Sequence, residues 1–354
     1  LLVTYFESDG SPHLFDPRHV LQRVLDRFND IGLRPVVALE QEFYLLDPEG
    51  ALDGNPQPPI MPLTGRRVSG TQVLSISDLD GFGDFFDAVS EACIIQKIPI
   101  GPVSAEYATG QYEINLKHSD DPMAACDHAM LLPRVIKGVA RNHDVDATFM
   151  AKPYPDQSGS GMHMHVSLLD EKGNNVFSGS DEMGSDILKF AAAGLLETMP
   201  EAMAFFAPNI NSFRRFEPGV YAPVNRSWGY NNRSVAVRIP AGGNENRRLE
   251  HRIAGADANP YLALAAVLSG MHYGISQKLS PPPAAHGKEM DEPDEDLPTE
   301  CGWALEVLEE SKVLADYMGA EYCELYVECK RDELRSFMSR VSSREYQWYL
   351  RPDG

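Results

Sequence analysis

Apolar residues follow two kinds of spacing along this chain, and each spacing predicts a different kind of element. In some stretches they recur every third or fourth position, which gathers them on one face of an amphipathic helix. In others they alternate with polar residues, as on a strand with one buried face. We expect helices at 17–31, 78–96, 122–142 and 259–275, and through most of the last fifty or so residues. We expect strands at 34–47, 112–116, 146–154, 158–167, 235–239 and 247–252.

Three further stretches are expected to be loops. Residues 51–70 are rich in Pro and Gly, and residues 280–298 are acidic and Pro-rich. Residues 209–221 place the adjacent Arg214 and Arg215 before a Pro-Gly turn, which favours a mobile lid that carries positive charge.

The stretch from Arg233 to Arg252 concentrates arginine in a chain that is otherwise rich in acid. Its two strands flank a Gly-Gly turn and predict a hairpin. On the second strand Arg248, Glu250 and Arg252 share one face, because alternate side chains point the same way. Such a face is either a solvated surface with weak ion pairs or a polyanion site with a carboxylate ready for a metal.

Four more carboxylates lie near the ends of predicted strands. Glu40 and Glu42 stand two apart and face the same way, which is costly for like charges unless a cation lies between them. The wet face of a sheet is the alternative for this pair. Glu106 and Glu113 lie on either side of a Thr-Gly-Gln turn and bring two further acids to a strand end.

Two histidines alternate along the strand that follows a Gly-Ser turn. His163 and His165 share one strand face, and imidazole is a common ligand of divalent cations. Either histidine alone could be structural. The chain has neither the GxxxxGK[ST] loop nor a GxGxxG turn, so bound ATP would need arginines and metals to hold its phosphates.

Composition and charge narrow the class of protein. The 354 residues are 43% hydrophobic and can bury a sizeable core in one or two domains. A net charge of -21 argues against a nucleic-acid or anionic-membrane partner. Five cysteines without a CxxC pair suit reduced thiols, and no leader or membrane-spanning run is present, so we expect a cytoplasmic protein. The chain begins at Leu1 rather than Met, which leaves room for an upstream segment.

These motifs, in this order, resemble the glutamine synthetase superfamily. The resemblance rests on EQE, SAEYATGQYE, KPYPDQSGSGMHMHVSL, NINSFRRFEPG, NNRSVAVRIP, RRLEHR and ANPYLALAAVL and covers essentially the whole chain. It implies one catalytic domain at 1–354 of the α+β class, with a curved, mostly antiparallel sheet wrapped by helices. Residues 260–354 would be largely helical, and the family's smaller N-terminal β-grasp domain is not visible.

The resemblance also implies which residues hold ligands. One Mg²⁺ or Mn²⁺ would be held by Glu42, Glu106 and Glu113, and a second by Glu40, His163 and Glu250. The residues expected at ATP are His165, Ser167, Arg233, Arg238 and Arg248. The residues expected at glutamate are Gly159, Arg215 and Arg252. The positions expected to act in catalysis are Arg215, Tyr221 and Arg233.

The reaction that the resemblance implies has two steps. The γ-carboxylate of glutamate attacks the γ-phosphate of ATP to give γ-glutamyl phosphate, and an amine then displaces phosphate to form an amide. Metals and arginines would neutralise charge on the phosphoryl oxygens as it moves. The family assembles as rings, usually dodecamers of two stacked hexamers, so the implied partners are small substrates and further copies of the chain.

Departures from the family pattern bear on the amine. Tyr221 stands where ammonia-using members carry a flap Glu, Ser158 replaces the usual Asn, and Glu245 replaces a Lys. A neutral phenol cannot bind ammonium as a carboxylate does. With Trp228 close by in sequence, Tyr221 indicates an aromatic-lined mouth for a larger amine, held in part by cation–π contact.

These departures favour the γ-glutamylpolyamine, or γ-glutamylputrescine, synthetase branch of the family. Four alternatives remain open at this point: Tyr221 as a packing residue at a turn, glutamine synthetase proper using ammonia, an inactive relative that keeps the fold, and a phosphagen kinase of related catalytic architecture. The intact set of six metal ligands argues against the inactive relative, because such a group of acids is costly without a cation.

Overall fold

The computed structural model describes residues 2–52, 54–180, 183–218, 222–287 and 292–350. Within these residues lies an open eight-stranded sheet in the order β4-β5-β1-β7-β10-β9-β8, with β6 also paired to β1. The strands are β1 (Arg34–Leu46), β4 (Ile100–Ala105), β5 (Gln111–Leu116), β6 (Asp146–Thr148), β7 (Met162–Leu169), β8 (Trp228–Tyr230), β9 (Val237–Ile239) and β10 (Leu249–His251). Only the β8–β9 pair is parallel among these pairings, which confirms the mostly antiparallel α+β fold.

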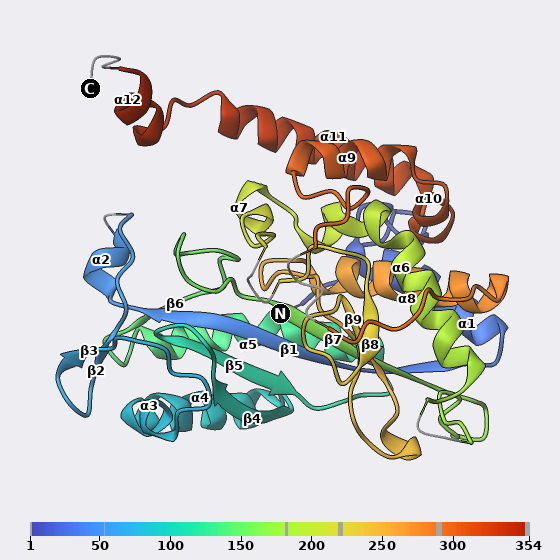
Figure 1. Ribbon diagram of the computed structural model, residues 1–354, viewed down its shortest axis with the longest axis horizontal. Helices are drawn as coiled ribbons and strands as arrows, with labels where there is room; N and C mark the ends of the chain where they lie inside the picture. Colours follow the sequence, from blue (N-terminus) through green and yellow to red (C-terminus); the bar gives the residue numbers. More distant parts are fainter. Residues whose placement is uncertain (1, 53, 181–182, 219–221, 288–291, 351–354) are drawn as a thin grey trace.

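The long strand β1 lies in the sheet between β5 and β7, and its side chains point alternately to the two faces of the sheet (Figure 1). Val37, Leu39 and Phe43 point to one face and are buried in the core. Glu40 and Glu42 alternate with them and therefore point to the other face. A slip of one residue in strand pairing would exchange the two faces, so this alternation fixes the register.

Helix α5 (Pro122–Ala140) covers the core face of β1. Gln41 on that face donates from Nε2 to the Ala129 carbonyl of α5 over 2.9 Å. The start of α5 is fixed by Asp121, whose side chain accepts from the Ala124 amide at 3.0 Å, followed by Pro122 at the first helical position. The expected helix at 122–142 is thereby confirmed, two residues shorter at its end.

A helical layer lies beyond the sheet. Helices α6 (Asp186–Phe206) and α8 (Pro260–Gln277) pack against each other, and α1 (Pro17–Asp30) packs on α8. The outer helices are α9 (Cys301–Glu310), α10 (Val313–Met318), α11 (Ala320–Met338) and α12 (Ser343–Tyr349). In Figure 1 α12 lies at the far end of α11, away from the sheet. The predicted helices at 17–31 and 259–275 and the helical last part of the chain are confirmed.

Four expected segments differ from the structure. The strand expected at 146–154 ends at Thr148, as β6. The helix expected at 78–96 is two helices, α3 (Ile76–Gly81) and α4 (Gly83–Gln96), which meet at Phe82. The loop expected at 51–70 follows a short helix, α2 (Pro48–Leu52), and contains a small hairpin of β2 (Ile60–Met61) and β3 (Arg66–Arg67). The loop expected at 209–221 begins with a short helix, α7 (Ile210–Phe213), whose capping box is built by Asn209 and Ser212.

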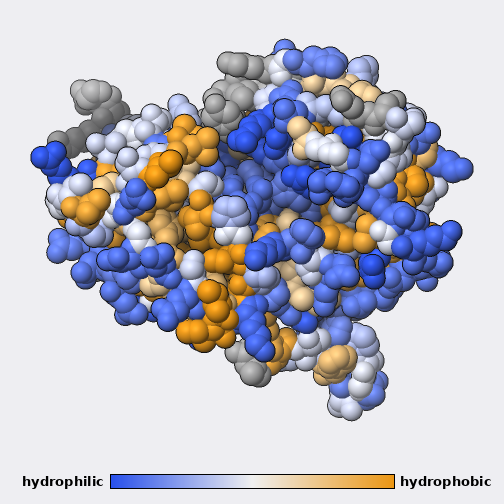
Figure 2. All heavy atoms as spheres, turned by 90° about the horizontal axis from the view of Figure 1, so that it is seen from below, coloured by the Kyte–Doolittle hydropathy of each residue, from blue (hydrophilic) through white to orange (hydrophobic). Residues whose placement is uncertain are grey.

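The apolar interior is largely continuous. The main cluster of buried side chains runs from Val20 in α1 to Val327 in α11, as one domain requires, and the single domain at 1–354 stays a prediction. None of the described helices combines the length and the apolar content that crossing a bilayer needs. Figure 2 shows apolar side chains gathering on the left of the lower face, where Figure 1 places α3 and α4. On these two helices Ile76, Ile94 and Ile95 are each more than 70% exposed.

Candidate functional site

Strand pairing brings the predicted ligands into register across the sheet. Residues directly opposite each other on paired strands point to the same face. Glu42 lies opposite Glu113, and Glu40 lies opposite His163. One strand further along, Glu250 lies between His165 and Arg238. The sheet therefore collects these groups on one face without the help of loops.

All six predicted metal ligands line one cavity of about 380 Å³. The same cavity is lined by four of the predicted arginines, namely Arg215, Arg233, Arg238 and Arg252, and by Gly159. The wet-face alternative for Glu40 and Glu42 is wrong, because Glu42 is only 8% exposed and hydrogen-bonded. The solvated-face alternative for the arginine hairpin is wrong too, because Glu250 is only 1% exposed.

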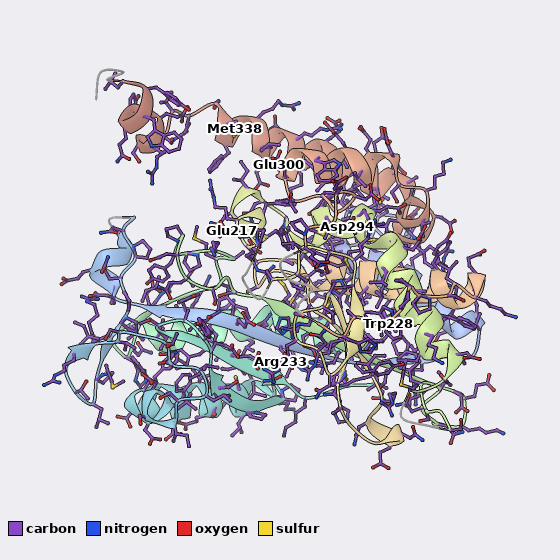
Figure 3. The ribbon with its side chains drawn as sticks, in the orientation of Figure 1. Glu217, Trp228, Arg233, Asp294, Glu300 and Met338 are labelled. Atoms are coloured by element: carbon purple, nitrogen blue, oxygen red, sulfur yellow. The ribbon has the colours of Figure 1, made fainter. Side chains whose placement is uncertain are left out.

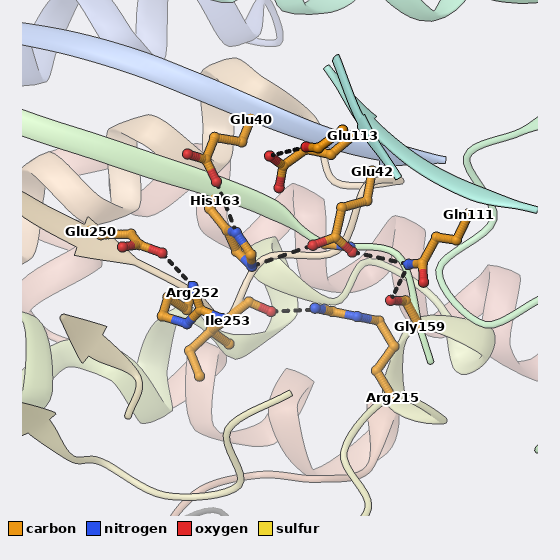
Figure 4. Close-up of polar contacts among 12 residues, drawn as sticks. Glu40, Glu42, Gln111, Glu113, Gly159, His163, Arg215, Glu250, Arg252 and Ile253 are labelled. Carbon is orange, nitrogen blue, oxygen red and sulfur yellow. Dashed lines mark hydrogen bonds and ion pairs between the residues drawn. The ribbon is translucent and has the colours of Figure 1, made fainter. Parts of the chain in front are cut away.

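His163 links the carboxylates at the centre of the cavity (Figure 4). Its Nδ1 lies 3.1 Å from Glu40 Oε2, and its Nε2 lies 3.7 Å from Glu42 Oε1. His165 approaches the other oxygen of Glu40, with its Nε2 2.6 Å from Oε1. Glu42 is held from its far side, where Oε2 accepts from the Gly161 amide over 2.7 Å.

Glu40 and Glu250 stay ionised because hydrogen-bond donors and positively charged side chains face them. Burial alone would raise the pKa of Glu40, but hydrogen bonds from His163 and then His165 hold that pKa far below its usual range. Burial also opposes ionisation of Glu250, yet Arg252 and the neighbouring histidines lower its pKa to about 2. Glu250 accepts from Arg238 Nη1 over 2.7 Å and from Arg252.

The pKa values of Glu106 and Glu113 are raised instead, because both carboxyl groups are buried and face other acids. Burial, followed by the charge of Glu42, raises the pKa of Glu106 to about 7. Burial, followed by the charges of Glu40 and Glu42, raises the pKa of Glu113 to about 8. Both groups hold protons near neutral pH as long as no cation neutralises the cluster. This is the electrostatic state expected of a cation site.

Two groups of ligand atoms are close enough to share an ion. Glu40, Glu113 and His163 form one group, and Glu40, His165 and Glu250 form the other, with all atoms of each group within 4.8 Å. Carboxylate oxygens with an imidazole fit Mg²⁺ or Mn²⁺. The groups differ from the predicted sets: His165 joins the second, and Glu42 and Glu106 line the cavity without belonging to either.

Buried arginines supply positive charge opposite the acids. Arg215 is 3% exposed and donates from Nη1 to the Ile253 carbonyl over 2.8 Å (Figure 4). The Nε groups of Arg215, Arg238 and Arg252 are buried and have no hydrogen-bond partner among the described residues. All three arginines line the cavity, where their guanidinium groups can bind an anionic ligand.

Gly159 stands where a side chain cannot fit. A Cβ atom there would lie 2.5 Å from Arg215 Cγ and 2.8 Å from the Ala151 carbonyl oxygen. Its own carbonyl accepts from Gln111 Nε2 over 3.0 Å, and the same nitrogen lies 3.3 Å from Glu42 Oε2. No sequence pattern predicted that Gln111 would hydrogen-bond both Gly159 and Glu42.

The predicted ATP residues are divided between two neighbouring cavities. Arg233 and Arg238 line the acid-rich cavity, whereas His165, Ser167 and Arg248 line a second cavity of about 740 Å³. Arg248 donates from Nε to His165 Nδ1 over 3.1 Å. The two cavities meet at the central strands, because Glu40 lines both.

The predicted aromatic mouth consisted of Tyr221 and Trp228. Tyr221 lies outside the described residues. Trp228 does not line the acid-rich cavity, so its predicted place at the mouth is wrong. Its indole N–H donates to the Pro282 carbonyl over 2.7 Å, and its ring lines a separate cavity with Phe190. Figure 3 accordingly shows Trp228 toward α6, apart from Arg233.

An aromatic side chain does line the acid-rich cavity, and it is Tyr107, directly after Glu106. Val73 and Leu74 line the same cavity from the segment before α3. Tyr107 lies in the same motif as Glu106, but no sequence pattern singled it out. No pattern pointed toward Val73 or Leu74, because they come from an irregular segment that only the tertiary fold brings to the site.

Comparison with known proteins identifies relatives over nearly the whole chain. A family model described as the glutamine synthetase catalytic domain matches residues 14–349. Gamma-glutamylputrescine synthetase PuuA of Escherichia coli (strain K12) is 42% identical over 351 residues, which cover 99% of this chain and 74% of that protein. The glutamine synthetase of Halobacterium salinarum is 34% identical, over 99% of this chain and 77% of that protein.

An amine ligase and a solved structure extend the comparison. A glutamate–isopropylamine ligase from a Pseudomonas species is 33% identical over 97% of this chain and 75% of its own length. The solved structure titled as a GmaS/ADP complex has a TM-score of 0.86 and 27% identity, and it covers 97% of this chain and 79% of that one. Sequence and fold therefore agree on the relatives.

Proposed function

Because the chain belongs to the glutamine synthetase family, we propose that it is an ATP-dependent ligase that joins the γ-carboxylate of glutamate to an aliphatic amine, putrescine first among them. The observation that carries this proposal is one cavity in which acids, an imidazole and arginines face each other. Such a cavity suits a triphosphate with its cations beside an amino acid.

The acids are proposed to hold two or more divalent cations, Mg²⁺ or Mn²⁺. Glu42, Glu106 and Glu113 would hold one, and Glu40, His163 and Glu250 the other, as the family pattern implies. In the structure Glu40 lies within both close groups of ligand atoms, which differ from these sets but support two cations that lie near each other. Bound cations would neutralise charge on the phosphoryl oxygens.

The arginines are proposed to divide the substrates between them. Arg215 and Arg252, buried beside Gly159, would hold the carboxylates of glutamate. Arg233 is exposed where it lines the cavity and would steady the transferred phosphoryl group together with Arg238.

The other predicted nucleotide residues, His165, Ser167 and Arg248, line the adjacent cavity, which is where the rest of ATP would lie. This division lets the γ-phosphate meet glutamate in the acid-rich cavity, as in-line transfer requires. Tyr221 is proposed to contact the amine, in part by a cation–π interaction.

An amine larger than ammonia is favoured by the relatives and by the cavity. Two of the relatives carry the names of putrescine and isopropylamine ligases. Apolar side chains of Val73 and Leu74 line a cavity that is otherwise acidic. Glutamine synthetase is the second candidate, since relatives with that name are 34% identical or less.

We also propose an assembly, a cellular location and a set of partners for the protein. A ring-shaped dodecamer follows from the family pattern alone. A cytoplasmic location is supported by the five cysteines, all of which are free thiols. ATP, glutamate and the amine are the proposed partners, without nucleic acid or membrane.

Turnover with a panel of amines tests the proposed function. ADP release would be measured with glutamate and Mg²⁺ or Mn²⁺ in the presence of ammonium, isopropylamine, putrescine or spermidine, and the amide identified by mass spectrometry. We expect putrescine to give the highest kcat/KM. Ammonium as the best acceptor would instead identify a glutamine synthetase, and no ADP release with any acceptor would identify an inactive relative.

Two neighbouring arginines provide a matched pair of variants. Arg215 is buried and lines the cavity, whereas Arg214 is exposed and does not line it. Arg215→Ala should lower kcat/KM for glutamate by about a hundredfold or more, because the clamp on a carboxylate is lost. Arg214→Ala should leave it unchanged. Equal effects of the two variants would contradict the assigned role of Arg215.

A further inference from the structure

Three apolar or aromatic side chains stand at the open side of the acid-rich cavity. Val73, Leu74 and Tyr107 line that cavity and are also 53%, 74% and 44% exposed, so they lie where it meets solvent. We call these three residues the apolar rim. Exposed apolar side chains that gather at a polar site mark a contact with something apolar.

The rim is fixed next to Glu106 by backbone pairing. The Leu74 amide donates to the Ala105 carbonyl over 2.9 Å, and the Gln72 amide donates to the Tyr107 carbonyl over 3.3 Å. These two bonds lie on either side of Glu106 along the chain. The segment that carries Val73 and Leu74 therefore runs beside Glu106.

Buried side chains fasten this segment to the turn between β4 and β5. Gln72 is 4% exposed, donates from Nε2 to the Gln111 carbonyl over 2.6 Å and accepts from the Gly110 amide over 3.1 Å. Thr109 Oγ1 donates to the Gly70 carbonyl over 2.6 Å. An apolar pair held this firmly is a built feature of the cavity and not a loose loop.

Leu74 occupies a backbone conformation that leucine seldom adopts. Its φ of 57° lies in the left-handed region, where a Cβ atom crowds the backbone and glycine is usual. The fold therefore keeps an exposed leucine at a strained position beside the site. Strain of this kind is retained where a side chain has a function.

We propose that the apolar rim contacts the methylene chain of the acceptor amine and sets the preference for alkylamines over ammonium. This inference rests on the proposed function and adds the residues that select the substrate. The acids of the cavity attract the ammonium end of the amine, and the rim shields the carbon chain from water. The Tyr107 ring can also receive the distal ammonium of a diamine by cation–π contact.

A series of amines of increasing length measures the rim directly. The acceptors are ammonium, methylamine, ethylamine, propylamine, butylamine and putrescine, and kcat/KM is determined for each. Burial of one methylene group improves kcat/KM roughly two- to fourfold, so a steady rise with chain length is expected. Leu74→Ser should bring this factor close to one, while the KM values of glutamate and ATP stay unchanged.

Two further variants separate contact from folding. Leu74→Gly removes the side chain and relaxes the backbone at φ 57°, so it should fold at least as well as the native protein and lose the same chain-length preference. Leu63→Ser changes a leucine that is 73% exposed but does not line the cavity, and it should keep the preference.

Each outcome has a distinct meaning. If ammonium is the best acceptor of the native protein, the proposed function fails, and the inference fails with it. If alkylamines are preferred but Leu74→Ser and Leu74→Gly keep the chain-length factor, the inference alone fails. If these variants change the size of the assembly and leave the factor intact, the rim contacts a second copy of the chain, and the inference is overturned.

Discussion

At the scale of single residues, the missing side chain of Gly159 explains how Arg215 reaches the site. Replacement by alanine would push a Cβ atom onto the Arg215 side chain and the Ala151 carbonyl. We predict that Gly159→Ala raises KM for glutamate about ten- to a hundredfold, because a displacement near 1 Å spoils a carboxylate clamp. Steady-state kinetics with glutamate as the varied substrate measures this.

Gly138 in α5 is the matched control for that variant. A Cβ atom added there meets nothing within 4 Å, and the residue is exposed. Gly138→Ala should leave KM unchanged and stabilise the protein by up to about 1 kcal/mol, since alanine favours a helix. An unchanged KM in Gly159→Ala would show that Arg215 does not depend on this glycine.

The protons on Glu106 and Glu113 predict how cation binding depends on pH. With pKa values of about 7 and 8, both carboxyl groups are partly or fully protonated at neutral pH before a cation binds. A cation has to displace these protons, so affinity for Mn²⁺ should rise from about pH 6 to about pH 9 and then level off. The slope approaches tenfold per pH unit for each proton displaced.

Titration calorimetry in two buffers of different ionisation enthalpy counts these protons directly. We expect release of one to two protons near pH 7 and almost none above pH 9 or so. Glu113→Gln should remove about one of them. Affinity that does not change with pH would contradict the raised pKa values of this pair.

The face on which a residue lies could be predicted where it follows from a local pattern along one strand. The two-residue spacing of Glu40 and Glu42 placed both on one face, and the structure confirms it. The resemblance paired Glu40 with His163, but the approach of His165 to Glu40 could not be predicted, because it depends on how β7 pairs with β1. Trp228 was misplaced because nearness to Tyr221 in sequence says nothing about which face of β8 carries the ring.

At the scale of elements, glycines set the distance between α6 and α8. A Cβ atom on Gly194 of α6 would meet the Gly270 carbonyl and the Gly274 amide of α8, so the two backbones touch. We predict that Gly194→Ala lowers the free energy of unfolding by about 1–3 kcal/mol, because overpacking forces the helices apart. Chemical denaturation measures this, with Gly138→Ala as the control, and an unchanged midpoint would contradict the close approach.

Elements were predictable where a period runs without interruption. The alternation of β1 and the caps of α1, α5 and α8 are local signals, and these elements form where expected. The boundary between α3 and α4 was missed because apolar residues continue through Phe82 and mask the break. Short hydrogen-bonded pieces such as α7 carry too few residues for a period to appear.

At the scale of the whole molecule, the aromatic residues of α12 are largely exposed to solvent. The side chains of residues 335–350 are exposed, with Trp348, Tyr349 and Leu350 at 63%, 71% and 67%. We propose that another copy of the chain covers these side chains. Ending the chain after Met338 should then change the melting temperature by less than about 2 °C and reduce the mass of the assembly.

Mass photometry and thermal unfolding on the same samples test that prediction. The double substitution Trp348→Ser with Tyr349→Ser should act in the same direction as the truncation, and Leu63→Ser should not. A truncated protein of unchanged mass would mean that α12 serves no contact between copies. A large loss of stability would mean that α12 packs on its own chain.

The overall architecture was predictable because the motifs span the chain in order, and their resemblance supplied what periodicity alone could not. Patterns of alternation indicated strands but not their order in the sheet. The order β4-β5-β1-β7-β10-β9-β8 brings residues far apart in sequence to one face, and it arises from tertiary packing.

Glu40 contributes to the walls of both cavities, and this gives the two compartments a common side chain. A ligand that reorients its carboxylate in one compartment alters the shape and charge of the other. By thermodynamic linkage such an influence is reciprocal: if nucleotide changes the affinity for glutamate by some factor, glutamate changes the affinity for nucleotide by the same factor. The size of this mutual effect would then depend on the one carboxylate that both compartments share.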